Sequence, residues 1–245
     1  MTNRMRLDQL LVQRDLAESR EKAQRLIRAG DVCVAHQPAT KPGHLFPDDA
    51  DITLKEKPRF VSRGADKLEE ALRHFHLNVE GKITMDVGAS TGGFSDCLLQ
   101  HGARRVYAID VGKGQLHWKL RQDPRVTVLE GVNARKLDPR WFDETPTLAT
   151  VDVSFISLTK ILPAVTTILP AAGEAVTLIK PQFEAGRDQV GRGGVVRDAA
   201  VHEEVVEKIR LFGSGELGWI WQGICASPIK GPAGNTEFLA YWRKQ

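Results

Sequence analysis

Residues 83–94 read ITMDVGASTGGF. Residues 83–87 have the apolar and β-branched character of a buried strand, and they run straight into a turn that contains Gly88, Gly92 and Gly93. Glycines between a strand and a helix let the backbone approach a ligand closely, and the amides of the first helical turn point towards that ligand. The segment therefore predicts a nucleotide-type cofactor site in an α/β domain.

The spacing of these glycines discriminates between cofactors. It is G-x-x-x-G-G, whereas dinucleotide-binding enzymes use G-x-G-x-x-G, and Asp86 stands just before the first glycine. A carboxylate is unfavourable beside a phosphate, but S-adenosylmethionine has no phosphate and carries an ammonium and a sulfonium. Asp110 follows the next strand, where a carboxylate would accept hydrogen bonds from the ribose hydroxyls of a cofactor. S-adenosylmethionine is the predicted cofactor; the alternative is that both carboxylates only cap helices.

Residues 61–245 alternate apolar runs of strand length with amphipathic helical patterns. Besides residues 83–87, the expected strands are residues 106–109, 126–129, 148–151, 175–179, 219–224 and 238–242. This alternation is typical of a doubly wound parallel sheet, so we predict a Rossmann-like, seven-stranded methyltransferase domain of the α/β class. Asn133 and Asp152 follow two of these strands, at the edge where open sheets bind ligands.

Lys180 closes the strand at residues 175–179. A lysine at the end of a hydrophobic strand is partly desolvated and could act as a base, although a solvated lysine at the start of a loop is the alternative. Residues 184–198, EAGRDQVGRGGVVRD, are glycine-rich and contain three arginines. Such a composition favours a mobile loop beside an active site that receives an anionic polymer.

The first 60 residues predict a separate, small α+β domain. Apolar residues at helical spacing predict one short helix around residues 7–11 and a second helix that begins after Ser19 and ends at Gly30. The pattern then changes to the period of a strand at residues 32–34 and again at residues 52–54. Residues 55–61, with charge and a proline but no periodicity, are the predicted linker.

The positive charge of the chain is concentrated in its first 30 residues. They contain seven basic and four acidic side chains, and this excess equals the net charge of +3 of the whole chain. A basic cluster on a small domain indicates a polyanionic partner, although a solvated helix face is the more ordinary explanation.

The segment RLDQLLVQRDLAESREKAQRLIRAGDVCVAHQPATKPG resembles the S4-type RNA-binding domain. The resemblance implies that two helices present basic residues to folded RNA, mainly through shape and phosphate contacts. Many relatives have Asn-Gly after V-x-V, where Ala35 and His36 stand here, so the hairpin turn is expected to differ. The side chains expected to contact RNA are Arg4, Arg6, Arg20, Lys22, Arg25 and Arg28.

The motifs SRGADKL, DVGASTGGFSD, IDVGKGQL, DVSFISL, IKPQFE and SPIKGPAGNTEFLAYW resemble those of the TlyA family of ribosomal RNA 2'-O-methyltransferases, over nearly the whole chain. The resemblance implies methylation of a ribose 2'-hydroxyl in ribosomal RNA, with cytidine as the nucleotide. Ribosomal RNA or ribosomal subunits are the implied partners. The residues expected to contact the cofactor are Asp86, Gly88, Ser90, Thr91, Gly92, Gly93, Phe94, Asp110, Val111, Asn133 and Asp152.

The catalytic half also resembles the wider FtsJ-like methyltransferases, which share a Lys-Asp-Lys-Glu tetrad. The matching residues are Lys67, Asp152, Lys180 and Glu237. Methyl transfer to a hydroxyl is an in-line displacement, so the nucleophile must be positioned and must lose its proton. We expect Lys180 to be the base, Lys67 to stabilise the developing oxyanion, and the two carboxylates to orient the lysines.

The remaining composition argues against several other classes of site. Cys33, Cys97 and Cys225 are far apart, so we expect buried apolar thiols and neither a disulfide framework nor a metal site. A polar start and the lack of a long apolar run predict a cytoplasmic protein without a signal peptide or membrane span. A haemolysin or pore-forming protein and a non-catalytic RNA-binding factor stay open as alternatives, and so does the oligomeric state.

Overall fold

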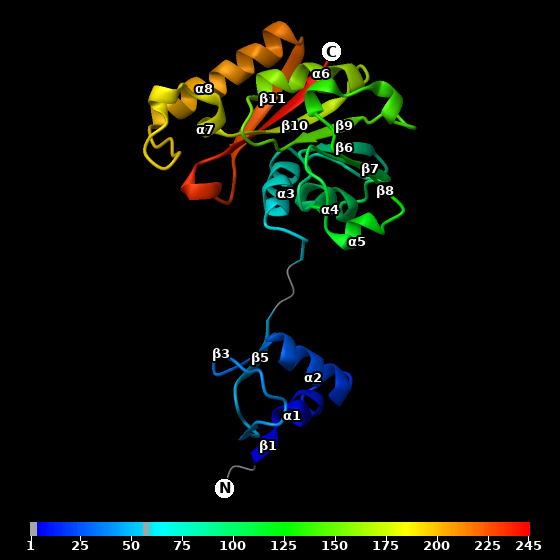
Figure 1. Cartoon of the computed structure of the whole chain (residues 1–245), viewed down its shortest axis with the longest axis vertical. Coiled ribbons are helices and arrows are strands. Elements are labelled where there is room, and N and C mark those ends of the chain that lie inside the picture. The colour runs from blue at the N-terminus through cyan, green and yellow to red at the C-terminus, as the bar shows by residue number, and fades with distance from the viewer. Residues whose placement is uncertain (1–3, 56–58) are drawn as a thin grey trace. The chain divides into compact units, whose positions relative to one another are not determined.

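The computed structural model describes residues 4–55 and 59–245, and the chain divides into two compact units, Met1–Arg59 and Phe60–Gln245 (Figure 1). The larger unit is built on a seven-stranded sheet with the order β11-β12-β10-β9-β6-β7-β8. Strand β12 runs antiparallel to β10 and β11, and the other neighbours are parallel. The strands are β6 Ile83–Val87, β7 Arg105–Asp110, β8 Val126–Glu130, β9 Leu148–Val151, β10 Glu174–Ile179, β11 Trp219–Ala226 and β12 Phe238–Lys244.

Helices cover both faces of this sheet, as Figure 1 shows. One face carries α3 Gly64–His74, α4 Gly93–Gln100 and α5 Trp118–Arg121, and the other carries α6 Leu162–Ile168, α7 Pro181–Glu184 and α8 Ala199–Leu211. The seven predicted strands and the covering helices confirm the Rossmann-like methyltransferase fold.

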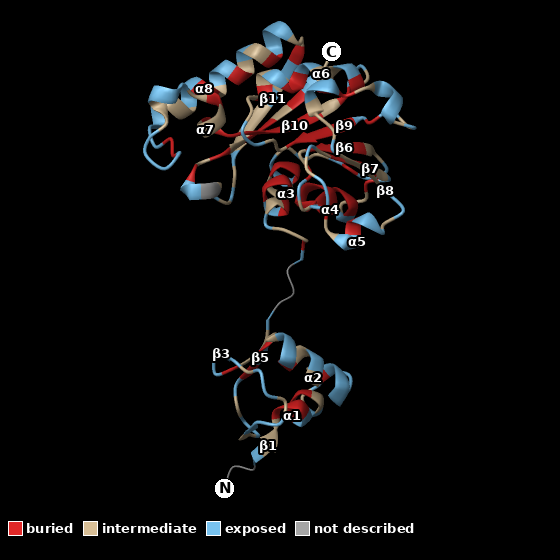
Figure 2. Cartoon of the chain, viewed as in Figure 1, coloured by how far each residue is buried: buried red, intermediate tan, exposed pale blue. Residues whose placement is uncertain are grey.

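The two layers of helices pack on alternate residues of the same strands. In β7, Val106 and Ala108 belong to the hydrophobic core beneath α3 and α4, whereas Tyr107 and Ile109 belong to the core beneath α6 and α8. Successive side chains of a strand point to opposite faces of a sheet, so a central strand covered on both sides buries the side chains on both of its faces. Figure 2 shows this burial along the strands and on the inner faces of the helices.

The smaller unit has more elements than the sequence predicts. Its helices are α1 Leu7–Gln13 and α2 Arg20–Ala29, and its strands are β1 Arg4–Arg6, β2 Val32–Val34, β3 Gln37–Pro38, β4 Leu45–Pro47 and β5 Ile52–Leu54. Strand β2 lies between β3 and β5, and β1 pairs with β4. The hydroxyl of Ser19 accepts a hydrogen bond from the Lys22 amide, and Gly30 has a φ of 76°, which confirms both predicted ends of α2.

The turn between β2 and β3 keeps a glycine-type geometry without a glycine. Ala35 and His36 have φ angles of 47° and 63°, and they form the two-residue loop of the hairpin. Both central residues of such a type I' turn need positive φ, which Asn-Gly adopts more easily. The hairpin therefore has the same kind of turn that Asn-Gly would form, with less favourable residues in it.

Candidate active site

The glycine-rich turn after β6 packs tightly between two other segments. A Cβ on Gly88, which has a φ of 89°, would lie 2.2 Å from the carbonyl oxygen of Asp152 after β9. A Cβ on Gly93 would lie 2.3 Å from the Ser62 hydroxyl, which precedes α3. Only glycine permits approaches this close. The turn, the end of β9 and the start of α3 therefore form one compact structure.

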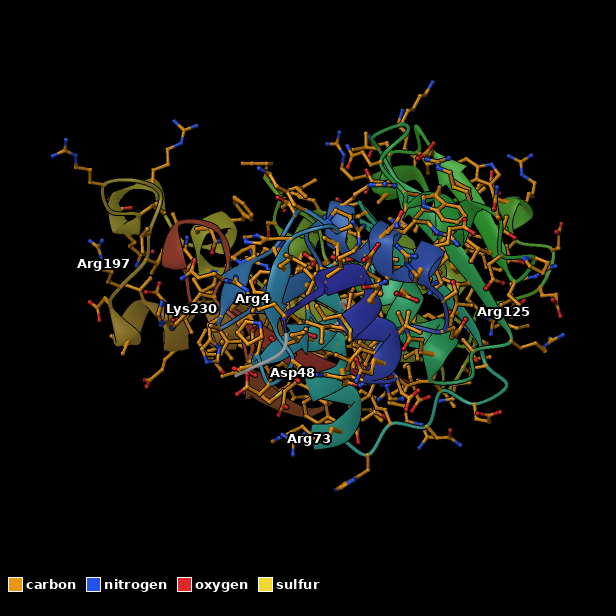
Figure 3. All side chains as sticks on the ribbon, turned by 90° about the horizontal axis from the view of Figure 1, so that it is seen from below. Arg4, Asp48, Arg73, Arg125, Arg197 and Lys230 are labelled. Atoms are coloured by element: carbon orange, nitrogen blue, oxygen red, sulfur yellow. The ribbon has the colours of Figure 1, made fainter. Side chains whose placement is uncertain are left out.

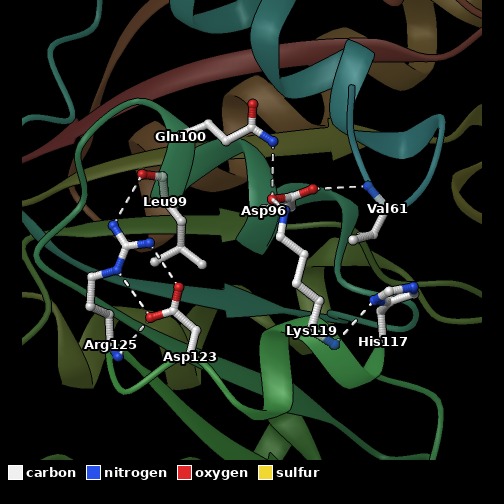
Figure 4. Close-up of polar contacts among 8 residues, drawn as sticks. All are labelled: Val61, Asp96, Leu99, Gln100, His117, Lys119, Asp123 and Arg125. Atoms are coloured by element: carbon white, nitrogen blue, oxygen red, sulfur yellow. Dashed lines mark hydrogen bonds and ion pairs between the residues drawn. The ribbon is translucent and has the colours of Figure 1, made fainter. Parts of the chain in front are cut away.

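Asp96 secures the start of helix α4 to the segments around it (Figure 4). Its carboxylate accepts hydrogen bonds from the backbone amide of Val61 at 2.9 Å and from the side chain of Gln100 at 3.1 Å. It also lies 3.7 Å from the ammonium of Lys119 in α5. One buried carboxylate therefore links the beginning of the larger unit, α4 and α5 behind the turn.

Two adjoining pockets open at the carboxyl edge of the sheet. The larger has a volume of about 540 Å³ and the smaller about 190 Å³, and both are lined by Gly88, Ser90 and Asp152. The larger has the size of a typical small-molecule site. Of the predicted cofactor residues, the pockets are lined by Gly88, Ser90, Thr91, Gly93, Phe94, Asp110, Val111, Asn133 and Asp152.

Asp110 is held rigidly at the mouth of the larger pocket. Its two carboxylate oxygens accept hydrogen bonds from the backbone amides of Ser90 and Gly112, each at 2.7 Å. Each oxygen of a carboxylate has a second lone pair, so the group can still accept bonds from hydroxyls in the pocket. Val111, beside it, is 73% exposed and offers an apolar surface to the same space.

Gly92 and Asp86 are the predicted cofactor residues that the described pocket linings do not include. A Cβ on Gly92 would lie 2.2 Å from Leu120, so this glycine serves packing. Asp86 is completely buried and accepts hydrogen bonds from the hydroxyls of Ser95, at 2.7 Å, and Thr150, at 3.1 Å. Burial raises the pKa of Asp86 to about 7, and the nearby charge of Asp152 acts in the same direction.

The raised pKa of Asp86 predicts that the folded protein loses stability as the pH rises. The unfolded carboxyl has a pKa near 3.8, so between about pH 4 and pH 7 the folded state binds more protons. The free energy of unfolding should fall across this window, by at most about 4 kcal/mol from this group, and then level off. In the Asp86→Asn variant this part of the slope should disappear, as measured by urea unfolding followed by tryptophan fluorescence at pH 5 and pH 8.

Asp143→Asn is the matched control for that experiment because the Asp143 side chain is 84% exposed. Its pH dependence should equal that of the unchanged protein. Equal slopes for the unchanged protein and Asp86→Asn would contradict the assignment of a buried, protonated carboxyl at this position.

Beside the pockets, two lysines form ion pairs with two carboxylates. The ammonium of Lys67 lies 2.6 Å from a carboxylate oxygen of Glu237, and that of Lys180 lies 2.5 Å from Asp152 and donates to the Ser154 hydroxyl at 2.9 Å. Lys67 and Lys180 are only 8% and 7% exposed. The four residues of the expected tetrad are thus brought together in two pairs.

The register of the sheet explains how residues so far apart in sequence meet. Ile179 of β10 pairs with Phe238 of β12, so Lys180 and Glu237 stand at the ends of adjacent antiparallel strands. The second carboxylate oxygen of Glu237 is buried and has no hydrogen-bond partner among the described residues. This oxygen is packed beside Gly231, where an added Cβ would lie 2.1 Å from it.

Glu184 joins the segment after β10 to the segment after β9, a role that the sequence did not reveal. Its buried carboxylate accepts hydrogen bonds from the Ser157 hydroxyl at 2.6 Å and from the Leu158 amide at 2.7 Å. Desolvation raises the pKa of this carboxyl. Its contacts fix the loop that carries Asp152 relative to the loop that begins at Lys180.

Several other residues that line the pockets were not predicted from the sequence. Ser62 and Gly64 line the smaller pocket, and Gln115, Arg135, Ser154 and Phe155 line the larger one. Ser154 follows Asp152 by two residues, and Ser62 begins the motif SRGADKL. Their positions within these motifs could have identified both serines as site residues.

The basic side chains of the smaller unit are not equally available to a partner. The fully buried carboxylate of Asp8 lies 2.9 Å from Arg6 and 3.3 Å from Arg20, and these guanidiniums hold its pKa well below the usual range. The remaining predicted RNA contacts are exposed residues, namely Arg4, Lys22, Arg25 and Arg28. Asp8 therefore fixes the orientation of Arg6 at the end of β1 and of Arg20 at the start of α2.

Further findings concern the cysteines, metals and membranes. All three cysteines are free, but only Cys97 is buried; Cys33 and Cys225 are half-buried, which corrects the prediction that all are buried. Within residues 4–55 and 59–245, no cluster of three or more histidine, cysteine or acidic side chains is arranged to hold a metal. No helix in the same residues has the length and apolar character needed to cross a membrane.

The chain is similar to known proteins over both units. The family model of the FtsJ-like methyltransferases matches residues 60–244, and that of the S4 domain matches residues 5–52. The chain is 51% identical over 238 residues to a Bacillus subtilis protein provisionally named rRNA methyltransferase YqxC, across 96% of this chain and 84% of that protein.

Two further likenesses extend over the full chain. One is to the 16S/23S rRNA (cytidine-2'-O)-methyltransferase TlyA of Mycobacterium tuberculosis, with 45% identity over 247 residues, which is 100% of this chain and 92% of that protein. The other is to a solved structure from Streptococcus thermophilus, provisionally named a hemolysin, with a TM-score of 0.76, 48% identity and coverage of 100% of this chain and 90% of that one.

Proposed function

Because the chain belongs to the FtsJ-like methyltransferase family, we propose that it transfers a methyl group from S-adenosylmethionine to a ribose 2'-hydroxyl of ribosomal RNA, at a cytidine. The relative from Mycobacterium tuberculosis, whose name states this reaction, matches the whole of this chain. The observation that carries the proposal is the pair of lysine–carboxylate contacts, Lys67–Glu237 and Lys180–Asp152, beside the pockets. Ribosomal RNA as substrate also places the proposed activity in the cytoplasm.

The larger pocket has the chemistry that S-adenosylmethionine requires. A fixed carboxylate, Asp110, can accept hydrogen bonds from ribose hydroxyls, and the apolar Val111 can lie against a flat base. Asp152, which lines both pockets, adds negative charge where the ligand carries positive charge. When bound, S-adenosylmethionine supplies an electrophilic methyl group on a sulfonium.

Lys180 is the residue that we assign to proton removal. Its amine lies between Asp152 and Ser154 at the rim of the larger pocket, and it is nearly enclosed by protein. In its neutral form the amine can accept the proton of a 2'-hydroxyl that lies within hydrogen-bond reach. Asp152 then stabilises the resulting ammonium, which would otherwise be a poorly solvated charge.

The second pair, Lys67 and Glu237, has a different role in this proposal. The ammonium of Lys67 can stabilise negative charge that develops on the ribose oxygen, in a site where few water molecules weaken the interaction. Glu237 orients Lys67 through the ion pair that joins them at 2.6 Å. In this proposal, the two ion pairs together provide a general base, a positive charge beside the developing oxyanion, and carboxylates that orient both lysines.

The smaller unit, which matches the S4 domain, supplies binding in this proposal. Arg6 and Arg20 are fixed by Asp8, and the other exposed cations lie on β1 and α2. Phosphate contacts position a protein on folded RNA without reading its sequence. The catalytic unit therefore acts on a nucleotide that the smaller unit helps to select.

The test is to incubate the protein with radiolabelled S-adenosylmethionine and unmodified ribosomal subunits, and to map the label. We expect the label on the 2'-oxygen of one or a few cytidines. Label on a base instead would contradict the proposed roles of Lys67 and Lys180, and binding of subunits without any transfer would favour a non-catalytic RNA-binding factor.

A further inference from the structure

The loop between α7 and α8 contains exposed arginines that the proposed chemistry does not use. Arg187, Arg192 and Arg197 are all exposed. Across the described parts of the chain, none of the three lies within ion-pair distance of a carboxylate. Elsewhere on the surface of this unit, Arg73, Arg104, Arg125, Arg140 and Arg210 each pair with a nearby acid. Arg63, Arg135 and Arg243 are exposed and, like the loop arginines, have no ion pair among the described residues.

Of the acidic residues near these arginines, Asp188 is exposed and directly follows Arg187 in the sequence. Asp198 caps α8 by accepting a hydrogen bond from the Ala200 amide at 2.9 Å. Glu204 accepts a hydrogen bond from the Gln189 side chain at 2.9 Å, and Glu184 is buried. Arg192 and Arg197 therefore have no ion-pair partner among the described residues, whereas Arg187 stands beside the exposed Asp188 in the sequence.

The loop has a definite structure that fixes where this charge lies. Gly191 and Val195 form a β-bridge, and Gly193 and Gly194 between them have φ angles of 78° and 75°. Val195 and Val196 are buried. Arg192 thus lies at the tip of a small hairpin whose base is packed into the protein.

Asn235 attaches this hairpin to the strand that carries the proposed catalytic carboxylate. Its side chain is only 2% exposed; it accepts a hydrogen bond from the Val196 amide at 3.1 Å and donates one to the Gly194 carbonyl at 2.9 Å. Asn235 precedes Glu237 by two residues, about 7 Å along an extended chain. The hairpin is therefore fixed next to the active site.

Lys230 extends the same charged surface. It lies on the exposed turn before β12, and its ammonium donates to Thr236 at 2.7 Å. Figure 1 shows this turn beside the loop that carries the arginines, and Figure 3 shows Arg197 and Lys230 on the same side of the catalytic unit, away from Arg125. We call Arg187, Arg192, Arg197 and Lys230 the basic rim.

We propose that the basic rim is a second RNA-binding surface, which holds phosphates of the substrate next to the target ribose. An RNA whose 2'-hydroxyl reaches Lys180 must bring its flanking phosphates past the edge of the sheet, and guanidiniums on a fixed hairpin can bind them in a bidentate manner. The choice of RNA as partner rests on the proposed function, whereas the unpaired charge and its attachment to β12 do not.

The experiment measures binding of unmodified ribosomal subunits at several salt concentrations and constant magnesium, without S-adenosylmethionine. The Arg187→Gln/Arg192→Gln/Arg197→Gln variant should bind more weakly, and the slope of log affinity against log salt should become shallower by about 2 to 3, because each lost phosphate contact removes about 0.7 to 0.9. Replacement of the same three arginines by lysine should restore most of the slope.

The matched control removes three arginines from other places on the catalytic unit, Arg104, Arg125 and Arg140, which are exposed and ion-paired with acids. Their replacement by glutamine should leave the slope almost unchanged, and Figure 4 shows the pairing of Arg125 with Asp123 that explains why. Affinity for S-adenosylmethionine, measured by calorimetry, should be the same in all variants, which establishes that the fold is intact.

Two results would overturn the proposal: an unchanged slope in the rim variant, or equal losses in the rim and control variants. Because binding is measured without methyl transfer, the outcome is independent of the proposed reaction. If the unchanged protein bound subunits through the rim but transferred no methyl group, the rim would stand and the proposed function would fail.

Discussion

The Lys180→Ala variant is expected to lose methyl transfer, with a fall in kcat of at least about 1,000-fold, while its affinity for S-adenosylmethionine stays within about twofold of the unchanged protein. General-base catalysis by a positioned side chain contributes about 100- to 10,000-fold, and here the alanine also leaves Asp152 without its cation. The measurement is single-turnover transfer of label to ribosomal subunits, with cofactor affinity from calorimetry on the same preparation.

Lys82→Ala is the matched control for this experiment. Lys82 forms an ion pair with Glu174 near the starts of β6 and β10, at the edge of the sheet opposite to Lys180. Its loss should leave kcat unchanged, which separates a catalytic effect from the removal of a lysine–carboxylate contact as such. Turnover retained in Lys180→Ala would exclude Lys180 as the base.

The Gly88→Ala variant is expected to lose both stability and cofactor binding. An added Cβ would lie 2.2 Å from the Asp152 carbonyl oxygen, which is backbone and cannot rotate away, and the residue would keep a φ of 89°. A forced shift of this kind, added to left-handed strain, should destabilise the protein by about 3 kcal/mol or more. Because Gly88 and Asp152 line both pockets, affinity for S-adenosylmethionine should fall by more than about 100-fold.

Gly81→Ala separates strain from steric conflict in this prediction. Gly81 also has a positive φ, 70°, but a Cβ there would meet nothing within 4 Å among the described residues. Its substitution should cost about 1 to 2 kcal/mol and leave cofactor affinity unchanged. Urea unfolding and calorimetry check both variants, and similar cofactor affinities for the two would show that the close approach at Gly88 does not shape the pocket.

The sequence predicted the large elements well because their patterns are long and regular. All seven strands of the sheet lie within about two residues of their predicted positions, because each is dominated by apolar and β-branched residues. Strands β1, β3 and β4 were missed because RMR, QP and LFP lack the two apolar residues at a spacing of two that identify VCV in β2 and ITL in β5. The same limit applies to the turn at Ala35 and His36, whose positive φ angles are set by pairing across the hairpin.

The pairing of side chains within the site could not be predicted from the sequence. Lys180 and Asp152 are recognisable as strand ends, but which lysine pairs with which acid depends on the antiparallel insertion of β12 between β10 and β11. Asp86 also stands at a strand end, yet the alternation of side chains directs it into the protein towards Ser95 and Thr150. These residues were recognised by their positions in sequence motifs. Their contact partners, however, follow from the register of the sheet.

The place of β12 in the sheet also has a consequence for the order of events during synthesis. Every other strand of the sheet precedes β12 in the chain, and β12 then enters between two strands that already exist. A nascent chain that has emerged only as far as β11 has the turn at Gly88 and the lysines, but it has neither Glu237 nor the strand that joins β10 to β11. In the proposed mechanism, a nascent chain without β12 therefore lacks the carboxylate that orients Lys67, and its active site is complete only after β12 has joined the sheet.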